Sequence, residues 1–169
     1  MKALTIIVAA LVLAGMVGAA PAGLQAVFTV QFPKGHAASN APCDPDAFCG
    51  VGEVTGFGQA TITILDETFD EVDGSPCFAV TRVESIDLLD GTGSLVLQSE
   101  GTFCRPGRSG DSNAGRSSYG GPGRFDLTYT VDGAASTGVF AAATGTGSEV
   151  MKVDGGIGVW QLTGSLGGS

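Results

Sequence analysis

The sequence of residues 77–104 is CFAVTRVESIDLLDGTGSLVLQSEGTFC, and this stretch decides the fold. At its centre, Asp90-Gly91 is a strong signal for a two-residue hairpin loop, because both central positions of a type I′ turn need positive φ. Folding the chain about this pair brings cysteine opposite cysteine and hydrophobic residue opposite hydrophobic residue: Cys77 and Cys104, Phe78 and Phe103, Ile86 and Leu95. Such cross-strand pairs stabilise sheets. Each arm is about twice as long as a usual strand, which favours a barrel or a strongly coiled sheet.

The first arm of this hairpin carries charges on its hydrophobic side. Strand alternation puts Arg82 and Glu84 on the face that also holds the large apolar residues of the arm. Burying either charge alone would be costly, so the two would pair with each other or meet water. Inside a barrel they could orient the polar group of an apolar ligand or act in acid–base chemistry. The alternative is a bulge that turns both outward, or a position near the barrel rim.

The composition is that of a single β domain. The chain has 169 residues, and its 28 glycines separate short alternating runs of hydrophobic and polar residues. We predict an all-β fold, an antiparallel up-and-down β-barrel of about eight strands that spans residues 23–169, because closure removes the exposed edges of such long strands.

Outside the central hairpin, five further runs are expected to form strands: residues 25–32, 51–65, 125–132, and the two arms of a last hairpin, 148–153 and 157–166. Three glycines, Gly52, Gly56 and Gly58, predict a bend or bulge within the second of these runs.

The first 22 residues are a predicted signal peptide. Lys2 supplies the positive n-region, residues 3–17 the apolar h-region, and Ala20-Pro21-Ala22 a small-residue cleavage site. We expect cleavage after Ala22 and export to the cell exterior or the periplasm. The alternative is an uncleaved anchor. The apolar run is short for a membrane span and no basic cluster follows it, so we expect no stable membrane anchor.

Four cysteines fit an exported chain with two disulfides. Sequence alone permits three pairings, and the hairpin register selects Cys77–Cys104, which leaves Cys43–Cys49 as a small local loop. Zinc binding is the competing interpretation. The cysteines lack CxxC spacing and His36 is the single histidine, so we expect no metal.

Two polar segments allow more than one interpretation. The acidic run 66–74 could chelate calcium, although a solvated turn between the strand 51–65 and the hairpin is the commoner case. Residues 105–124 are rich in glycine and arginine; they form either an anion-binding flap or, as we favour, a flexible linker. The formal net charge of -9 disfavours nucleic acid as a partner.

A family resemblance lies in residues 129–147. Its elements are Tyr129-Thr130-Val131-Asp132-Gly133, Ser136-Thr137-Gly138-Val139-Phe140 and Gly145-Thr146-Gly147. They resemble the signature of the allene oxide cyclase and dirigent barrels, and more closely that of secreted bacterial proteins with this barrel: a tyrosine strand, a Gly-Gly-Thr-Gly-x-Phe turn and a glycine-punctuated strand. Ala134-Ala135 replace the double glycine, and Ala142 stands where many relatives have glycine.

The resemblance implies an eight-stranded barrel with an apolar cavity, often homo-oligomeric in plant relatives. It makes Tyr129 a third ligand-binding candidate beside Arg82 and Glu84. The catalytic residues of the plant cyclases lie in early strands that have no match here, so none is transferred.

The sequence shows no catalytic constellation. His36 stands in the N-terminal loop, with no Gly-x-Ser-x-Gly elbow and no phosphate-binding glycine loop elsewhere. We therefore predict a secreted, non-catalytic barrel that binds a small apolar ligand or serves as an extracellular structural or interaction module, without a cofactor. The alternative is a cyclase- or isomerase-like enzyme that steers a reactive apolar intermediate. An open cavity at Arg82 and Glu84 would favour ligand binding or catalysis, and a filled core a structural role.

Overall fold

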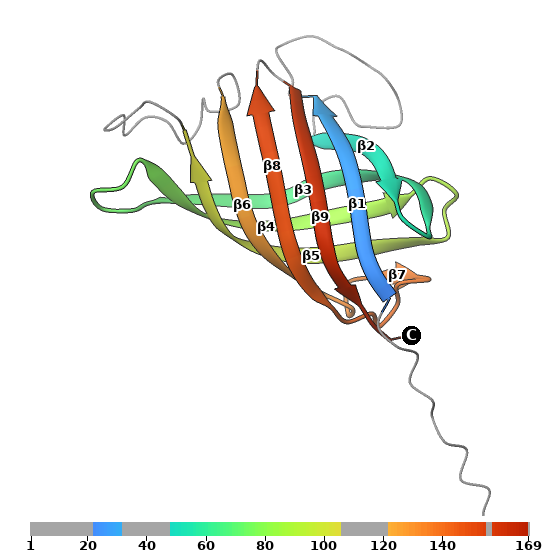
Figure 1. The fold of residues 1–169 in the computed structure, drawn as a ribbon. Helices are drawn as coiled ribbons and strands as arrows, with labels where there is room; N and C mark the ends of the chain where they lie inside the picture. The colour runs from blue at the N-terminus through green and yellow to red at the C-terminus, as the bar shows by residue number, and fades with distance from the viewer. Residues whose placement is uncertain (1–21, 32–47, 106–121, 155–156, 169) are drawn as a thin grey trace, which may run out of the picture.

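The computed structural model describes residues 22–31, 48–105, 122–154 and 157–168, which form nine β-strands and no helix (Figure 1). The strands are β1 (Ala22–Gln31), β2 (Cys49–Val54), β3 (Gly58–Glu71), β4 (Cys77–Leu88), β5 (Gly93–Cys104), β6 (Gly123–Val131), β7 (Thr137–Gly138), β8 (Thr146–Asp154) and β9 (Ile157–Leu166). The predicted signal peptide lies outside the described residues, except for Ala22.

The long strands close into an antiparallel barrel, as predicted. Around the ring the order is β4-β3-β2-β1-β9-β8-β6-β5, and pairing of β5 with β4 completes it. The ring also brings the first and the last strand of the sequence side by side. β1 and β9 pair along their whole length, from Ala22 with Leu166 to Gln31 with Ile157. The short β7 pairs with the beginning of β5 outside the ring. Closure gives every strand of the ring a neighbour on both sides, although beyond Ile64 β3 pairs with β4 alone among the described residues.

The central hairpin has the predicted register. Cys77 pairs with Cys104 and Ile86 with Leu95 across β4 and β5, and the Cys77–Cys104 disulfide is formed. The apolar side of β4 points into the barrel, as predicted. The predicted partner pair Cys43–Cys49 is not tested, because Cys43 lies outside the described residues.

The loop of this hairpin differs from the type I′ prediction. Four residues, Leu89 to Thr92, connect the strands, and of the two central residues only Gly91 has positive φ, at 74°. The Asp90 carboxylate instead accepts hydrogen bonds from the N–H and the hydroxyl of Thr92, which holds the wider turn.

The wider loop keeps every side chain on its predicted face but shifts the hydrogen-bonding phase of the ladder by one pair. The Cα atoms of Cys77 and Cys104 are 4.3 Å apart. This matches the roughly 4.5 Å of a non-hydrogen-bonded pair, whereas a two-residue loop predicts about 5.5 Å.

Residues 51–65, predicted as one bent strand, belong to two strands. A turn at residues 55–57 separates β2 from β3, with Gly56 and Gly58 at φ of 84° and 100°. These glycines therefore reverse the chain where a bend was expected. Beyond the turn, β3 continues to Glu71, so much of the acidic run 66–74 is strand and not loop.

A β-bulge in β3 decides which of its acidic residues face inward. The register against β4 shifts between Ile64 and Asp66, and the extra residue, Leu65, is 58% exposed. A bulge of one residue exchanges the two faces of the strand that follows it. As a result Glu67 and Phe69 point into the barrel and Asp66 points out.

Side chains fill most of the described interior. Large residues from all round the ring are fully buried, among them Phe28, Ile62, Ile86, Leu97, Phe125, Met151 and Trp160. Aromatic rings lie over glycines: Phe28 covers Gly52, and Tyr129 covers Gly147 and Gly164. An eight-stranded barrel is just wide enough for such side chains.

The disulfide Cys77–Cys104 is compatible with an oxidising compartment such as the cell exterior. Among the described residues, no helix has the length and hydrophobicity needed to cross a membrane.

Candidate functional site

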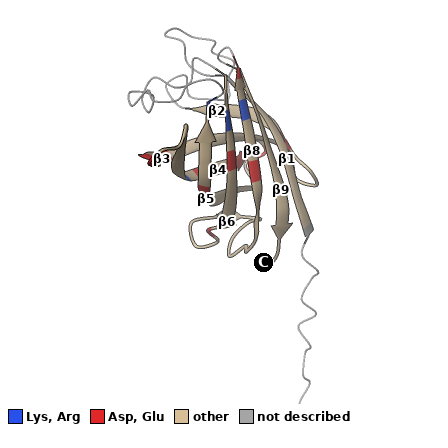
Figure 2. Cartoon of the chain, turned by 60° about the vertical axis from the view of Figure 1, so that its left-hand side comes forward, with Lys and Arg blue, Asp and Glu red and all other residues tan. Residues whose placement is uncertain are grey.

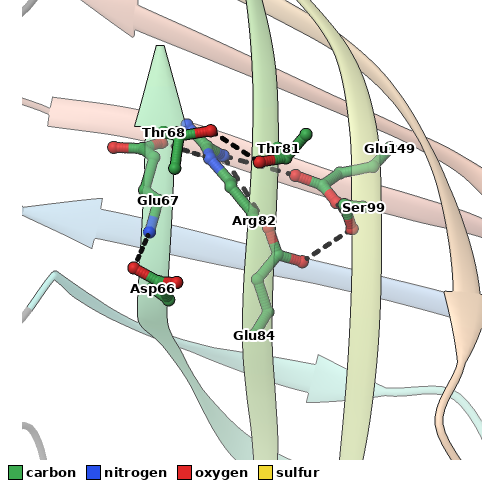
Figure 3. Close-up of polar contacts among 8 residues, drawn as sticks. All are labelled: Asp66, Glu67, Thr68, Thr81, Arg82, Glu84, Ser99 and Glu149. Atoms are coloured by element: carbon green, nitrogen blue, oxygen red, sulfur yellow. Dashed lines mark hydrogen bonds and ion pairs between the residues drawn. The ribbon is translucent and has the colours of Figure 1, made fainter.

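Arg82 is the centre of a buried polar network (Figure 3). Its side chain leaves the middle of β4, is completely buried, and donates a hydrogen bond from Nε to Glu67 on β3. Its Nη1 lies 3.4 Å from Glu149 Oε1 on β8 and 3.8 Å from Glu84 Oε1 on its own strand. One guanidinium therefore faces three carboxyl groups inside the barrel.

Glu84 and Glu149 are joined by Ser99 on β5. The Ser99 hydroxyl lies 3.3 Å from Glu84 Oε2 and 3.0 Å from Glu149 Oε2. Both glutamates have no exposed surface and Ser99 only 3%. In Figure 3 the two carboxyl groups point toward each other from different walls of the barrel. This is the arrangement of a carboxyl pair that shares a proton.

Burial and charge shift the pKa values of this pair upward. Burial raises the pKa of Glu84 well above its usual range, the negative charge of Glu149 raises it further, and Arg82 opposes both effects. Burial also raises the pKa of Glu149, while Arg82, Glu84, Ser99 and Trp160 act to lower it. Burial therefore favours the protonated form of both carboxyl groups, and Arg82 opposes this effect in each of them.

Aromatic rings enclose the guanidinium. The Cζ atom of Arg82 lies 3.9 Å from the ring centroid of Phe125 on β6 and 5.5 Å from that of Trp160 on β9. Phe125 stacks on Phe103, with centroids 4.3 Å apart. Cation–π contacts of this kind stabilise a desolvated guanidinium and fix its plane.

Tyr129 lies in the same interior row as Arg82. Across the sheet, Arg82 is opposite Ser99, and Ser99 is opposite Tyr129. The Tyr129 hydroxyl lies over Gly147 and Gly164, where a Cβ at either position would meet it. Burial, followed by the charge of Glu149, raises the pKa of Tyr129 to about 12. Tyr129 is therefore a neutral phenol beside the network.

Three buried polar atoms of this region have no hydrogen-bond partner: Arg82 Nη2, the Tyr129 hydroxyl and Glu84 Oε1, which has only the 3.8 Å ion pair with Arg82 Nη1. Buried polar groups in native proteins are nearly always paired with protein, water or ligand. All three atoms belong to the sequence-predicted candidates Arg82, Glu84 and Tyr129. The unused hydrogen-bonding capacity is therefore concentrated at the predicted site.

The network approaches solvent at Glu67, whose side chain is 12% exposed. Two residues further along β3, the half-buried Phe69 contacts Phe78, Phe103 and Phe125, with ring centroids 6.0 to 6.4 Å apart. These phenylalanines lie at the barrel end where β3 turns into β4. A small molecule would reach Arg82 from this end past Phe69.

The charged groups of the site come from one side of the ring. Glu67, Arg82 and Glu149 lie on β3, β4 and β8, whereas β1 and β9 carry no charged residue (Figure 2). The wall formed by β1 and β9 thus contributes aromatic and aliphatic surface, including Phe28 and Trp160. The site combines polar and apolar walls, as small-molecule sites usually do.

Two hollows of about 440 Å³ and 540 Å³ lie on the outer wall of the barrel and share Thr81, Glu100 and Thr128. These three residues are exposed on β4, β5 and β6 and point away from the network. The first hollow is also lined by Arg82 and Ser99 and the second by Glu149, although the side chains of these three residues are buried.

The structure brings the three predicted ligand-binding residues together, and it adds four that sequence reasoning missed: Glu67, Ser99, Glu149 and Trp160. Ser99 and Glu149 show the signal that singled out Arg82 and Glu84, a polar residue on the apolar face of a strand. Trp160 was noted only as a strand residue. Glu67 had no local signal, because the bulge that turns it inward cannot be read from alternation.

Of the remaining predicted segments, the acidic run 66–74 contributes Glu67 to the network. In the part of the acidic run that faces outward, and throughout the described residues, no group of three possible metal ligands is found. Residues 106–121 of the glycine- and arginine-rich segment lie outside the described residues. Ala142, noted at a position where relatives have glycine, has φ of 59°, a conformation that favours glycine.

Comparison with known proteins yields no relative, since no family model, curated protein or solved structure matches the chain. The resemblance of residues 129–147 to the allene oxide cyclase and dirigent barrels therefore stays a prediction. The function has to be argued from the site itself.

Proposed function

We propose that this protein is a secreted, non-catalytic β-barrel that binds a small, largely apolar molecule. In this proposal Arg82, Glu84 and Tyr129 bind the polar group of the ligand. The observation that carries it is the buried network around Arg82, together with the unpartnered atoms Arg82 Nη2, Glu84 Oε1 and the Tyr129 hydroxyl.

A core built for stability alone would not contain this network. Replacing a buried ion pair with hydrophobic residues of similar volume is often neutral or stabilising, by about 1–4 kcal/mol. Burial also raises the pKa of two of the three carboxyl groups, Glu84 and Glu149, and raised pKa values concentrate at functional sites. A binding role accounts for both features, because the ligand would supply the missing hydrogen-bond partners.

The size and orientation of the ligand follow from what surrounds the network. The interior is filled at Arg82 and Glu84, which by itself favours a structural role, so a ligand has to be small and has to displace side chains to enter. Its apolar part would lie among Phe69 and Phe78 at the end of the barrel, and its polar group would reach past them to Arg82. Displacement of a half-buried phenylalanine costs less than displacement of a fully buried one.

Secretion is part of the proposal. It is supported by the apolar N-terminal segment with its small-residue cleavage site and by the Cys77–Cys104 disulfide. N-terminal sequencing of the exported protein should give Gly23 as the first residue, and a chain that still begins at Met1 would contradict it.

Native mass spectrometry of the exported protein tests ligand binding. We expect a non-covalent adduct of small mass that is released by organic solvent and lost in Glu84→Gln. Glu100→Gln is the matched control, because it removes the same charge from the outer wall of the adjacent strand. Complete absence of an adduct, and of binding when candidate ligands are added, would instead favour a structural module. The same spectra give the number of subunits and so test for a homo-oligomer.

A second candidate function, acid–base catalysis of an isomerisation, is favoured by one observation. Glu84 is a carboxyl group with a raised pKa that faces the carboxylate of Glu149, so one acid and one base lie side by side. An enzyme of this type would exchange carbon-bound hydrogen of its ligand with solvent. Incubation of the co-purified ligand with protein in D2O should then increase the ligand mass, and Glu84→Gln should abolish the increase. A binding protein leaves the ligand mass unchanged.

A further inference from the structure

The end of the barrel next to Phe69 is closed by an arm of two strands. The arm consists of residues 68–81: the last part of β3, the turn 72–76 and the first part of β4. Its tip projects from the barrel on the left of Figure 1. Among the described residues, the β3 part pairs with β4 alone, so the only backbone pairing of the arm with the ring is that of β4 with β5. An isolated two-stranded ribbon is marginally stable in water, and this seam therefore decides whether the arm stays closed.

The Cys77–Cys104 disulfide joins the outermost pair of the seam. Five residue pairs connect the arm to β5, from Cys77 with Cys104 to Thr81 with Glu100. The free energy of local opening is lowest at the ends of strands, where fraying begins. A covalent bond at the outermost pair prevents fraying from that end. The bridge therefore holds the arm against the barrel.

The phenylalanines at the entrance lie on the inner side of this bridge. Phe78 and Phe103, each adjacent in the sequence to one of the two cysteines, are paired across the seam. Phe69 on the arm contacts Phe103 and Phe125 of the opposite wall, with ring centroids 6.0 and 6.2 Å apart. Movement of the arm away from β5 would separate these rings and uncover the path to Arg82. Arg82 would remain in place, because its guanidinium stacks on Phe125 at 3.9 Å.

We propose that the Cys77–Cys104 disulfide is a redox-sensitive latch on the arm, and that its reduction opens a path from solvent to the Arg82 network. Both cysteines are partly exposed, so a reductant reaches the bridge while the barrel is folded. A dithiol reduces the bridge by thiol–disulfide exchange: two electrons and two protons pass to Cys77 and Cys104, which become thiols, and the dithiol becomes a disulfide. The latch goes beyond the proposed binding function, because it controls the access of any small molecule to the interior.

Quenching of tryptophan fluorescence tests the opening. Trp160 is the single tryptophan of the chain, is fully buried and lies beside Arg82. Its quenching by acrylamide, a small uncharged molecule, therefore reports access to the network. We expect little quenching in the oxidised protein, a severalfold larger quenching constant after reduction with dithiothreitol, and a return to the first value on reoxidation. An unchanged constant in the fully reduced protein would overturn the proposal.

Two double variants assign the response to this bridge. Cys77→Ala/Cys104→Ala should be quenched as strongly as the reduced wild type, with or without dithiothreitol. Cys43→Ala/Cys49→Ala, which removes the other two cysteines of the chain, should keep the response of the wild type. Weak quenching in the first variant, or loss of the response in the second, would contradict the latch.

Hydrogen exchange distinguishes opening of the arm from loosening of the whole barrel. After reduction, the amides of residues 68–81 should exchange about tenfold faster, which corresponds to an opening free energy lower by about 1.4 kcal/mol. The amides of β1 and β9, on the opposite side of the ring, should stay protected over the same time. Simultaneous loss of protection in both regions would mean that reduction unfolds the barrel, and the proposal would fail. Neither measurement uses a ligand, so its result does not depend on the binding function.

Discussion

Glu84 on β4 and Glu149 on β8 share one hydroxyl group, that of Ser99, at 3.3 and 3.0 Å. A serine hydroxyl has a single proton to donate, so it can satisfy only one of the two carboxylates. The second contact needs a proton on one of the two carboxyl groups, and burial raises the pKa of both. The two glutamates therefore titrate as a pair.

The stability of the barrel should fall as the pH rises above about 4.3, the ordinary pKa of a glutamate in the unfolded chain. Because the pKa of Glu84 is raised in the folded state, the folded protein binds more protons than the unfolded chain above this pH. One such carboxyl lowers the free energy of unfolding by at most about 1.4 kcal/mol per pH unit. Glu84→Gln, which resembles the protonated form, should flatten the profile measured by urea unfolding at pH 5 to 8. The control Glu100→Gln should retain the wild-type slope. A steep slope in Glu84→Gln would contradict the raised pKa of Glu84 as the cause of the pH dependence.

Tyr129 should ionise only near pH 12, because burial and the charge of Glu149 raise its pKa. The measurement is the ultraviolet absorbance of tyrosinate during an alkaline titration of the folded protein. We expect a late step that disappears in Tyr129→Phe. A raised pKa means that its contribution to stability is present below about pH 10 and is lost as the pH approaches 12. A variant that keeps the late step would show that another group produces it.

Gly164→Ala should destabilise the barrel strongly. A Cβ at this position would lie within 3.0 Å of the Tyr129 hydroxyl and of the backbone of β8, which cannot move aside. Overpacking of this kind costs typically about 1–3 kcal/mol, and more where backbone is involved. The matched control is Gly23→Ala on the paired strand β1, where a Cβ meets nothing within 4 Å. The midpoint of thermal unfolding should fall for Gly164→Ala and hardly change for Gly23→Ala; equal midpoints would refute the close approach of Tyr129.

Removal of the Cys77–Cys104 disulfide should lower the free energy of unfolding by about 3–4 kcal/mol in the chain-entropy model. The bridge spans a sequence separation of 27 residues and so restricts the unfolded chain considerably. The measurement compares denaturant unfolding of the wild type with that of a Cys77→Ala/Cys104→Ala double variant, both in non-reducing buffer. A loss below about 1 kcal/mol would mean that the closed hairpin is already formed in the unfolded ensemble.

The sequence could specify the central hairpin because everything that defines it is local. A turn signal at Asp90-Gly91, two cysteines at equal distance from it and strict alternation on both arms all give the same register. The exact loop did not matter, since loops of two and four residues keep the same faces. The register placed Arg82 and Glu84 on the apolar face of the arm, but a bulge that turns both outward or a position near the rim stayed open until the structure showed both buried.

Part of the site was visible but not recognised. Glu149 lies on the same face of its strand as the buried Met151 and Val153. Ser99 likewise shares a face with Leu97 and Phe103, so both residues show the signal that identified Arg82, a polar residue on an apolar face. Alternation gives the face of a strand, and hence burial, for each of them. It does not say which residue of another strand each one will meet.

Only the tertiary structure decided that Glu67, Arg82, Ser99 and Glu149 form one network. They lie on four strands whose relative positions are set by closure of the barrel between β1 and β9, a contact between the two ends of the chain. The bulge at Leu65 adds a local reversal of faces that no turn residue announces, and it alone brings Glu67 inside. The physical reason is that a period of two residues determines which side of a strand is buried, whereas the packing of the whole closed sheet determines which buried groups come into contact.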